Sequence, residues 1–456
     1  MRLSKLIENI FRRFLPSPFT IAILLTVLTI VLTLIFTENK TENNHLFTIL
    51  SYWEDGIWNN GLLVFAYQMM LILVLGHVLV LSKPMERLIL GITKFVQNTS
   101  TAAVLVALPT MLVSFFNWGL GLIFGAILAR KVGEYAQSKA IPINYPLIGA
   151  CGYVGLMVWH GGISGSAPIK ASEAGHIKSL LAGNENLLAR LPDAISTSST
   201  VFSLSNLLIF SSVVIAISVL VYYLGRKAAT SKIELPAYHF TPLEKKDLSG
   251  AERLDHSKVL SIGFAVLILM AFFVQYLPAL RQLNITPNML NFFMLGLAIL
   301  LHGSFKSFLN AVEDAIGDIA GILIQFPLYF GIMGIMANSA MINQISDFFV
   351  SISTETTLPI FTFLSAGIVN VFVPSGGGQW AIQGPLVLQS ALQLNVPLSK
   401  AIMALSYGDQ ITNMLQPFWA LPLLGITKLK AKEILPYTLL FMLVGSIVYI
   451  LGLLLF

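Results

Sequence analysis

Long apolar runs separated by short polar segments dominate the chain. The clearest runs have close to the ~20 residues that a bilayer-spanning helix needs, and they cover residues 19–36, 62–81, 201–224, 259–277 and 439–456. Further crossings are expected at residues 145–168, 288–302, 319–336 and 401–424. The pattern therefore predicts an all-α polytopic membrane protein.

Two pairs of apolar runs are too short for full crossings and are broken by glycine-rich segments. The first pair, at about 101–130, is interrupted by "NWGLG", and the second, at about 358–393, by "PSGGGQW". Irregular backbone at membrane depth is tolerated only where it is buried in protein or lines a cavity. We expect each pair to form a re-entrant helical hairpin. Two crossings are also interrupted, by "HGGISGSAP" and "LQPFWALP".

The basic residues predict the orientation, because Lys and Arg collect on the cytoplasmic side of helical membrane proteins. The N-terminal arm is basic, whereas the polar segment 37–60 is mostly acidic. We expect that segment to be an external loop with Trp53 and Trp58 as interfacial anchors. Basic residues flank the first hairpin and acidic residues flank the second. This predicts a cytoplasmic N-terminus, hairpins entering from opposite faces and an external C-terminus.

The order of elements recurs along the chain. Residues 1–225 contain a spanning helix, a hairpin, an interrupted crossing and a closing helix, and residues 259–456 contain the same series. The hydrophilic segment 226–258 between them is the expected cytoplasmic linker. The second series starts from the opposite face, which makes the two halves inverted repeats. Inverted repeats with discontinuous helices are a signature of secondary transporters, whose binding site lies near the midplane.

The composition narrows the function class. Hydrophobic residues make up 56% of the chain and charged residues 11%, against roughly 25% charged in soluble domains. This excludes a soluble protein. The net charge is +5, but the basic residues form no aromatic-interleaved patch, so no nucleic-acid partner is expected. The single cysteine, Cys151, allows no intrachain disulfide and fits no cysteine-based metal pattern, and we expect no cofactor.

The segment "PSGGGQW" predicts an anion site at a hairpin tip. The first N–H groups of a helix lack intrahelical acceptors and carry partial positive charge, and glycines let a ligand approach them closely. Close packing between helices is the alternative role of such glycines. The candidate substrate-binding residues lie at or beside the four breaks: Asn117, Trp118, Gly119, Gly161, Gly162, Ser164, Ser375, Gly376, Gly377, Gly378, Gln379, Trp380, Asn413 and Gln416.

Asp409 is the acidic residue placed deepest within a predicted crossing. An intramembrane carboxylate is costly and is a functional hypothesis by default. It could carry a proton, ligate sodium or hydrogen-bond Asn413 one turn further on. We assign Asp409 and His160 as candidate ion-coupling residues, with a possible sodium site near Asn117, Ser375, Asp409 and Asn413.

Four motifs resemble the bacterial short-chain fatty acid transporter family: "VPSGGGQWAIQGP", "YGDQITNMLQPFWALP", "FFNWGLGLIFGAILAR" and "GGISGSAP". The resemblance extends over nearly the whole chain. It implies a carrier for short-chain monocarboxylates such as acetoacetate or butyrate in the bacterial cytoplasmic (inner) membrane, related to the ion-transporter superfamily and moving by an elevator-like mechanism. The family pattern differs at two positions, with glycine in place of His160 and glutamate in place of Asp409, which leaves proton and sodium coupling open.

The expected partners are a short-chain carboxylate, a proton or sodium ion and the lipid bilayer. Whether a second copy of the chain joins in a homodimer is left open by the sequence. Three other functions compete with this one. A carrier for another small organic anion would share the same architecture, and a passive channel would lack saturable exchange. An intramembrane serine protease is suggested by Gly162-Ile163-Ser164-Gly165, but a nucleophilic serine needs a base within hydrogen-bonding reach.

Overall fold

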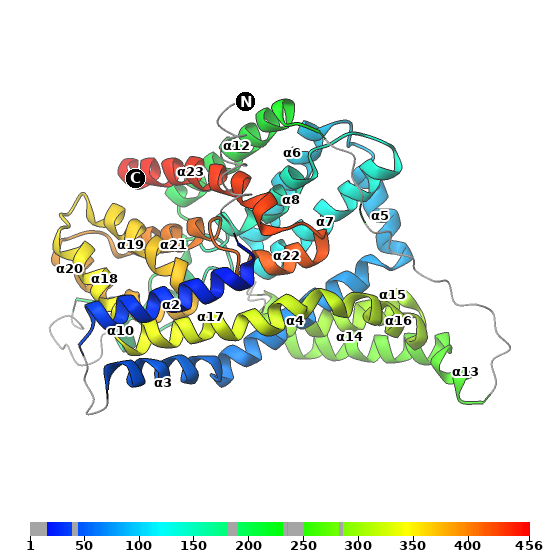
Figure 1. Ribbon diagram of the computed structural model, residues 1–456, viewed down its shortest axis with the longest axis horizontal. Coiled ribbons are helices and arrows are strands. Elements are labelled where there is room, and N and C mark those ends of the chain that lie inside the picture. The colour runs from blue at the N-terminus through cyan, green and yellow to red at the C-terminus, as the bar shows by residue number, and fades with distance from the viewer. Residues whose placement is uncertain (1–15, 39–43, 181–189, 231–234, 236–249, 282–285) are drawn as a thin grey trace.

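A computed structural model describes residues 16–38, 44–180, 190–230, 235, 250–281 and 286–456 of the 456-residue chain. The predicted cytoplasmic N-terminal arm, and most of the predicted linker 226–258, lie outside the described residues. Within the described ranges the regular elements are α-helices and short 3₁₀-helices (Figure 1). Six of these helices are long and apolar enough to cross a membrane, or up to eight if two bent pairs count as one span each. The protein is therefore an all-α, multi-pass membrane protein, as the apolar runs predict.

The first half of the chain folds into a series of helices in which long apolar helices alternate with shorter ones. They are α2 (Pro18–Phe36), α3 (His45–Ile57), α4 (Asn60–Val80), α5 (Lys83–Thr93), α6 (Thr99–Phe116), α7 (Trp118–Ser138), α8 (Tyr145–Tyr153), η1 (Val154–Met157), α9 (Ser166–Ala171), α10 (His176–Leu180), η2 (Thr197–Ser199) and α12 (Leu204–Lys227). The long apolar helices keep exposed leucine, isoleucine and valine side chains, as expected for lipid-facing surfaces.

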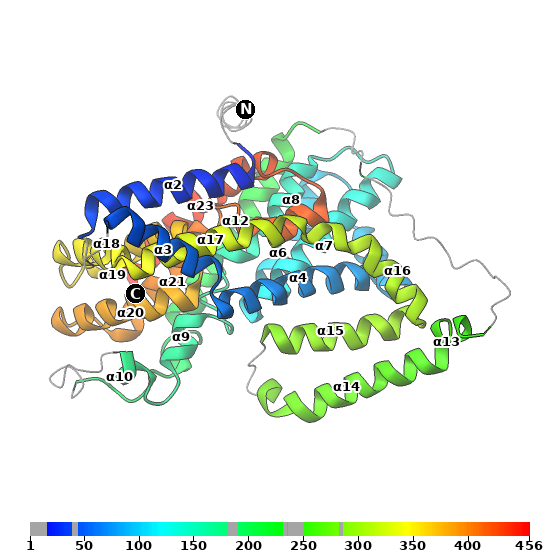
Figure 2. The same cartoon turned by 60° about the horizontal axis from the view of Figure 1, so that its bottom comes forward.

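The second half contains a comparable series. It comprises α13 (Glu252–Asp255), α14 (Lys258–Arg281), α15 (Pro287–His302), α16 (Phe305–Ala315), η3 (Ile316–Ile319), α17 (Ala320–Asn338), α18 (Met341–Ser351), α19 (Leu358–Phe372), α20 (Gly376–Gln393), α21 (Leu398–Thr412), α22 (Ala420–Thr427) and α23 (Ala431–Leu455). The predicted crossing at 288–302 is α15, and the chain turns by 120° between α15 and α16. Figures 1 and 2 place α14, α15 and α16 together beside α4, at the end of the molecule opposite α18, α19 and α20.

The first glycine-rich break separates two closely packed antiparallel helices. Asn117 ends α6 and begins α7, and its side chain accepts the N–H of Leu120 at 2.9 Å. A Cβ atom at Gly121 would overlap Ser114, and one at Gly125 would come within 2.7 Å of Thr110. Gly121 meets Ser114 and Gly125 meets Thr110, so residue numbers rise along α7 as they fall along α6. The two helices are therefore antiparallel. Glycine is needed at Gly121 because the backbone of α6 nearly touches it there, and at Gly125 because the backbone of Gly152 in α8 does.

The second break has the same local construction. Ser375 precedes α20, and its hydroxyl accepts the N–H of Gly378 at 3.2 Å, a side-chain cap of the helix. Gln379 then donates to the backbone oxygen of Ala366 at 2.9 Å, and Gln383 donates to Ser365 at 3.1 Å, so hydrogen bonds tie α20 to α19. The predicted breaks are thus real interruptions of helix with polar caps.

Most of segment 37–60, expected to be an external loop, is helix α3, so the expectation of an irregular loop is wrong. Its external location stays a prediction. This helix lies along α17, where Gly56 packs so closely on Gly331 and Gly334 that no side chain fits between the backbones. The Trp53 ring covers Gly331, so it is a packing contact rather than an interfacial anchor. The sequence analysis missed this helix because it is stabilised by close packing of glycines against α17 and not by a long apolar run.

Candidate functional site

A cavity of about 230 Å³ opens where the four helix breaks meet. Its wall is formed by the α20 tip, the start of α7, the break that follows η1 together with the start of α9, and the break that precedes α22; α4 and α17 close the remaining side. The lining residues are Leu62, Phe65, Trp118, Leu156, Trp159, Ser166, Phe330, Met333, Pro374, Ser375, Gly376, Gly377, Phe418 and Trp419. Segments more than 300 residues apart in the sequence therefore form the wall of one small cavity.

Aromatic rings form most of this wall. Trp118 lies edge-on to Trp419 with ring centroids 5.1 Å apart, and tilted against Trp159 at 6.0 Å. Phe65 of α4 meets Trp419 edge-on at 5.9 Å. Such pairs prefer edge-to-face and offset arrangements and make a stable apolar surface. The wall thus suits a short alkyl chain.

The polar part of the lining is the tip of α20. Ser375 supplies a hydroxyl, and Gly376 and Gly377 occupy the first turn, whose N–H groups have no acceptor within a helix. A Cβ atom at Gly376 would lie 2.8 Å from both the His160 and Trp159 rings, whereas one at Gly377 would have only Ser166 Oγ nearby, at 3.9 Å. The backbone at Gly376 therefore approaches the neighbouring side chains as closely as glycine permits.

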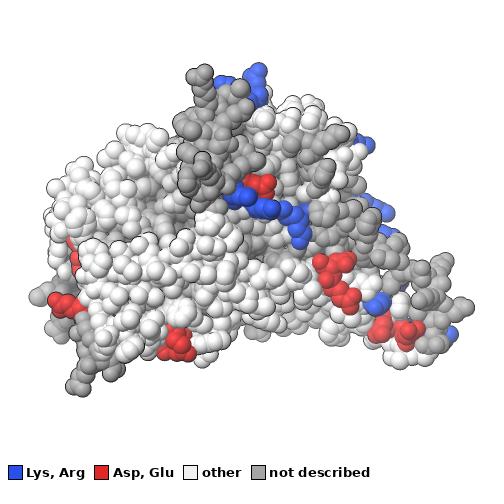
Figure 3. All heavy atoms as spheres, in the orientation of Figure 1, with Lys and Arg blue, Asp and Glu red and all other residues white. Residues whose placement is uncertain are grey.

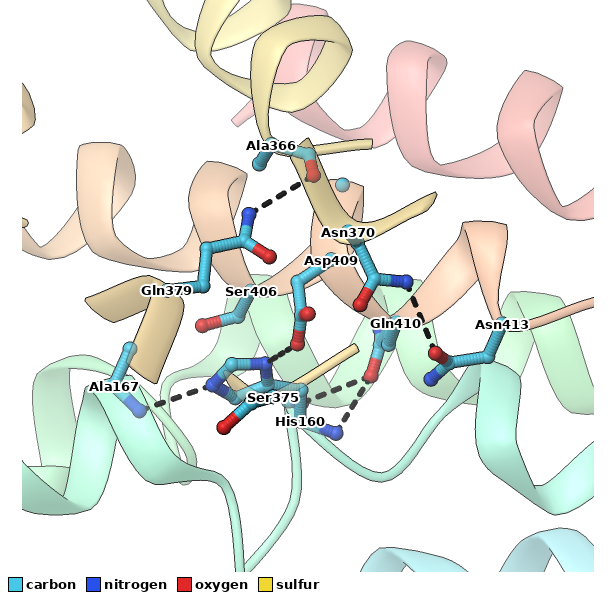
Figure 4. A network of polar contacts seen from close by, with 12 residues as sticks. His160, Ala167, Ala366, Asn370, Ser375, Gln379, Ser406, Asp409, Gln410 and Asn413 are labelled. Atoms are coloured by element: carbon cyan, nitrogen blue, oxygen red, sulfur yellow. Dashed lines mark hydrogen bonds and ion pairs between the residues drawn. The ribbon is translucent and has the colours of Figure 1, made fainter. Parts of the chain in front are cut away.

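A buried His160–Asp409 pair lies directly beneath this tip (Figure 4). The Nδ1 atom of His160 contacts Oδ2 of Asp409, and the Nε2 atom accepts the backbone N–H of Ala167 at 3.0 Å. Because Nε2 is an acceptor, the proton of the neutral ring is on Nδ1 and is donated to the Asp409 carboxylate. Both side chains are fully or almost fully buried. With a neutral ring, the pair can carry at most one negative charge.

Gln410 fixes the backbone that carries this histidine. Its Oε1 atom accepts the N–H groups of His160 at 2.7 Å and of Gly161 at 3.1 Å. Its Nε2 atom donates to the Tyr449 hydroxyl at 2.9 Å, which in turn donates to Met157 at 2.7 Å. The interrupted stretch after η1 is therefore held by side chains from α21 and α23, which replace the missing helical bonds.

A second polar network surrounds Asn413. Its Oδ1 atom accepts Nδ2 of Asn370 and Nε2 of Gln416, both at 3.0 Å, and its Nδ2 atom donates to Leu156 at 3.2 Å. Tyr153 donates to the backbone oxygen of Asn413 at 2.9 Å. Asn413 thus joins the break before α22 to α19 and to η1, and it bonds these groups rather than Asp409.

The candidate substrate residues divide into two groups. Trp118, Ser375, Gly376 and Gly377 line the cavity. The others lie at or beside the breaks but do not line the cavity: Asn117, Gly119, Gly161, Gly162, Ser164, Gly378, Gln379, Trp380, Asn413 and Gln416. Ser164, for example, accepts the N–H of Trp118 at 3.0 Å, and Trp380 points away to His176, to which its indole N–H donates at 3.1 Å.

Several residues of the site were missed by the sequence analysis. Gln410 and Asn370 were detectable as polar residues in otherwise apolar helices, one of them adjacent to Asp409. Phe65, Phe330 and Met333 had no such signal, because an apolar residue in a spanning helix looks the same whether it faces lipid or a cavity. These three residues reach the cavity only through the tertiary packing of α4 and α17.

Discontinuous helices meeting at a small internal cavity are typical of membrane transport proteins. The sequence model of the family described as "Short chain fatty acid transporter" matches residues 1–456. The chain belongs to this family.

Two relatives in particular are presumed short-chain fatty acid transporters. The protein of Escherichia coli (strain K12) is 34% identical over 100% of this chain and 99% of its own length. The protein of Haemophilus influenzae is 32% identical over 99% of both chains. Among solved structures, the YdaH transporter of Alcanivorax borkumensis aligns over 96% of this chain and 98% of its own, with 15% identity and a TM-score of 0.42. Since family members are transporters and not enzymes, the protease interpretation of Ser164 is set aside.

Proposed function

We propose that the protein is a secondary active transporter that carries short-chain monocarboxylates, such as acetoacetate and butyrate, across the bacterial cytoplasmic membrane. The observation that carries the proposal is the aromatic cavity closed at one side by the N-terminal turn of α20. Its volume of about 230 Å³ is below the ~300–1,000 Å³ of sites for drug-sized ligands. The substrate carboxylate binds the N–H groups and Ser375 at the tip, where helix N-termini favour anions, and the alkyl chain contacts the tryptophans.

Inverted repeats and an elevator-like motion complete the proposal. The series α4, α5, α6–α7, the broken helix α8–α9 and α12 has a counterpart in α17, α18, α19–α20, the broken helix α21–α22 and α23. Each half contributes one hairpin tip and one break to the cavity wall, with α4 and α17 as corresponding supports. In this mechanism the hairpins and broken helices move together along α4 and α17, which exposes the cavity to one side of the membrane at a time.

The coupling ion is a proton or sodium, and the His160–Asp409 pair supports a proton. The oxygen of Asp409 that faces the tip already accepts the imidazole, and the Asn413 oxygen already accepts two amide groups. A sodium ion at these atoms would displace those donors. A proton instead adds to the pair and neutralises its single charge, which makes the loaded carrier easier to move through the bilayer.

Reconstituted uptake tests the proposed function. Liposomes containing the purified protein are offered labelled butyrate, acetoacetate, succinate and an amino acid, with proton and sodium gradients imposed separately. We expect accumulation of the monocarboxylates with an inward proton gradient and saturable counterflow of labelled butyrate. Preference for succinate would favour a carrier of other organic anions, and flux without counterflow would favour a channel.

Substrate protection of Ser375 follows from its place in the cavity. In a Cys151→Ala background, Ser375→Cys should react with a small thiol reagent, and saturating butyrate should slow this reaction at least severalfold, whereas an amino acid should not. Gln393→Cys at the exposed far end of α20 is the matched control and should react equally in both conditions. Equal reactivity of Ser375→Cys with and without butyrate would contradict binding at the tip.

The opposite orientation of the two hairpins makes a separate prediction. Cysteines replacing Lys94 and Lys139, which flank α6 and α7, should both react only from the cytoplasmic side. Cysteines replacing Glu355 and Lys400, which flank the second hairpin, should react only from outside. Membrane-impermeant labelling of right-side-out and inverted vesicles measures this. Labelling of Lys94→Cys and Lys139→Cys from different faces would mean that the first pair crosses fully.

A further inference from the structure

A second pocket, of about 450 Å³, lies at the opposite end of α22 from the aromatic cavity. Three lysines line it: Lys428, Lys430 and Lys432. Figure 3 shows a row of basic side chains near the middle of this face, in the region of α22. Leu421, Leu424 and Leu429 provide an apolar floor. A cluster of cations above an apolar surface is the chemistry that recognises an amphipathic anion.

The pocket lies at a membrane boundary. Three apolar helices start beside it, namely α2 at Pro18, α17 at Ala320 and α23 at Ala431. Of these, α2 and α23 are candidate full spans, and most of α17 belongs to a bent pair that passes the same test. Because spanning helices start where the hydrocarbon core starts, the lysines lie at the level of the lipid headgroups.

The local chain conformation directs the three lysines to this place. Lys428 ends α22 with a φ of 60°, in the left-handed region that glycine or asparagine usually occupies at a helix end. Non-glycine residues held in this region concentrate at functional sites. The acidic residue nearby, Glu433, accepts the backbone N–H of Lys430 at 2.7 Å and so is committed to capping α23.

An apolar stripe leads from the pocket along α2. Phe19, Ile23 and Val27 are spaced by one helical turn each and are 42%, 42% and 54% exposed. Only 22% of the apolar stretch of α2 that could span the membrane is buried inside the protein. This side of α2 can therefore accommodate acyl chains below the lysines.

We propose that this pocket binds the headgroup of an anionic phospholipid, with the phosphate at Lys430 and Lys432 and the acyl chains along α2. The bound lipid joins α2 and the start of α17 to the α22–α23 turn, which connects the supporting helices with the broken helix of the substrate cavity. Basic pockets between transmembrane helices are known to hold anionic headgroups. Soluble phosphate has the same headgroup charge but no acyl chains, so the stripe on α2 favours the lipid.

Native mass spectrometry of the delipidated protein, titrated with phosphatidylglycerol, tests the proposal. The Lys430→Gln/Lys432→Gln variant should bind phosphatidylglycerol about tenfold or more weakly, since juxtamembrane lysines each contribute on the order of a fivefold attraction to anionic lipid. Lys227→Gln/Lys258→Gln, at the ends of two other spans, is the matched control and should bind like the wild type. Lys430→Arg/Lys432→Arg should keep the binding and thereby separate loss of charge from misfolding.

Two results would overturn the proposal. One is unchanged phosphatidylglycerol binding by the Lys430→Gln/Lys432→Gln variant. The other is displacement of the lipid by an equal concentration of inorganic phosphate, which would identify a site for free phosphate. Phosphatidylcholine, which is neutral overall, should bind no more strongly to the wild type than to the variant.

Discussion

Asp409→Asn is expected to abolish gradient-driven accumulation of butyrate while leaving substrate exchange measurable. Asparagine keeps the size of the side chain and can still accept the Nδ1–H of His160, so the tip of α20 keeps its support. It removes the ionisable carboxyl group of the pair, and with it the group that would carry a coupling proton or ligate a sodium ion. Accumulation and counterflow in the same liposomes measure the two activities separately. Accumulation at the wild-type level would show that Asp409 is structural.

Combined substitutions at His160 and Asp409 provide a control for this result. The family resemblance implies glycine in place of His160 and glutamate in place of Asp409, and the structure brings these two side chains into contact. Asp409→Glu alone should keep only partial activity, because the longer carboxylate must fit against the histidine ring. Adding His160→Gly to Asp409→Glu should restore accumulation toward the wild-type level. If the double variant is less active than Asp409→Glu alone, the glutamate side chain does not use the space that removal of the histidine ring leaves.

Gly376→Ala is expected to lower butyrate uptake by about ten- to a hundredfold. The added methyl group would lie 2.8 Å from the rings of His160 and Trp159 and 3.2 Å from Asp409. Overpacking of this kind costs about 1–3 kcal/mol, and each 1.4 kcal/mol or so is a tenfold change in rate. The strain displaces the tip from the His160–Asp409 pair, so uptake should fall even if the protein folds.

Gly263→Ala is the matched control for that experiment. Gly263 lies in α14, outside the cavity lining, and a Cβ atom added there would have no neighbouring atom within 4 Å. Uptake by Gly263→Ala should therefore stay within about twofold of the wild type. Thermal stability of both variants in detergent separates a folding defect from a local one. Equal loss in both variants would contradict the assigned role of Gly376.

Much of the fold was predictable because lipid imposes a simple rule on sequence. Helices α2, α12, α14 and α23 appear as uninterrupted apolar runs, since every backbone polar group must be satisfied within the segment. The breaks at Asn117 and Ser375 were also visible, because glycine and capping side chains interrupt those runs. The helix at 45–57 was missed, because its signal is close glycine packing against a partner far along the chain.

The candidate site was predictable in its location but less so in its contacts. Polar residues at four breaks predicted a ligand site there, and Ser375 and Trp118 do line the cavity at which the breaks meet. Ligand binding in it stays a prediction. The contact between His160 and Asp409 joins residues 249 positions apart, and no local pattern records such a contact. Trp380 lies beside a break as Trp118, Trp159 and Trp419 do, yet helix α20 turns it toward His176 instead of the cavity.

The central claim is that the substrate binds in the aromatic cavity. Locating the bound substrate tests this claim most directly. Crystals of the protein grown with 3-bromobutyrate would locate the bromine by its anomalous scattering. We expect one strong peak in the cavity between Trp118, Trp159 and Trp419, with the carboxylate at the N-terminal turn of α20. Unlabelled butyrate in excess should remove the peak. A peak at the lysine pocket or elsewhere, with the aromatic cavity empty, would contradict the account.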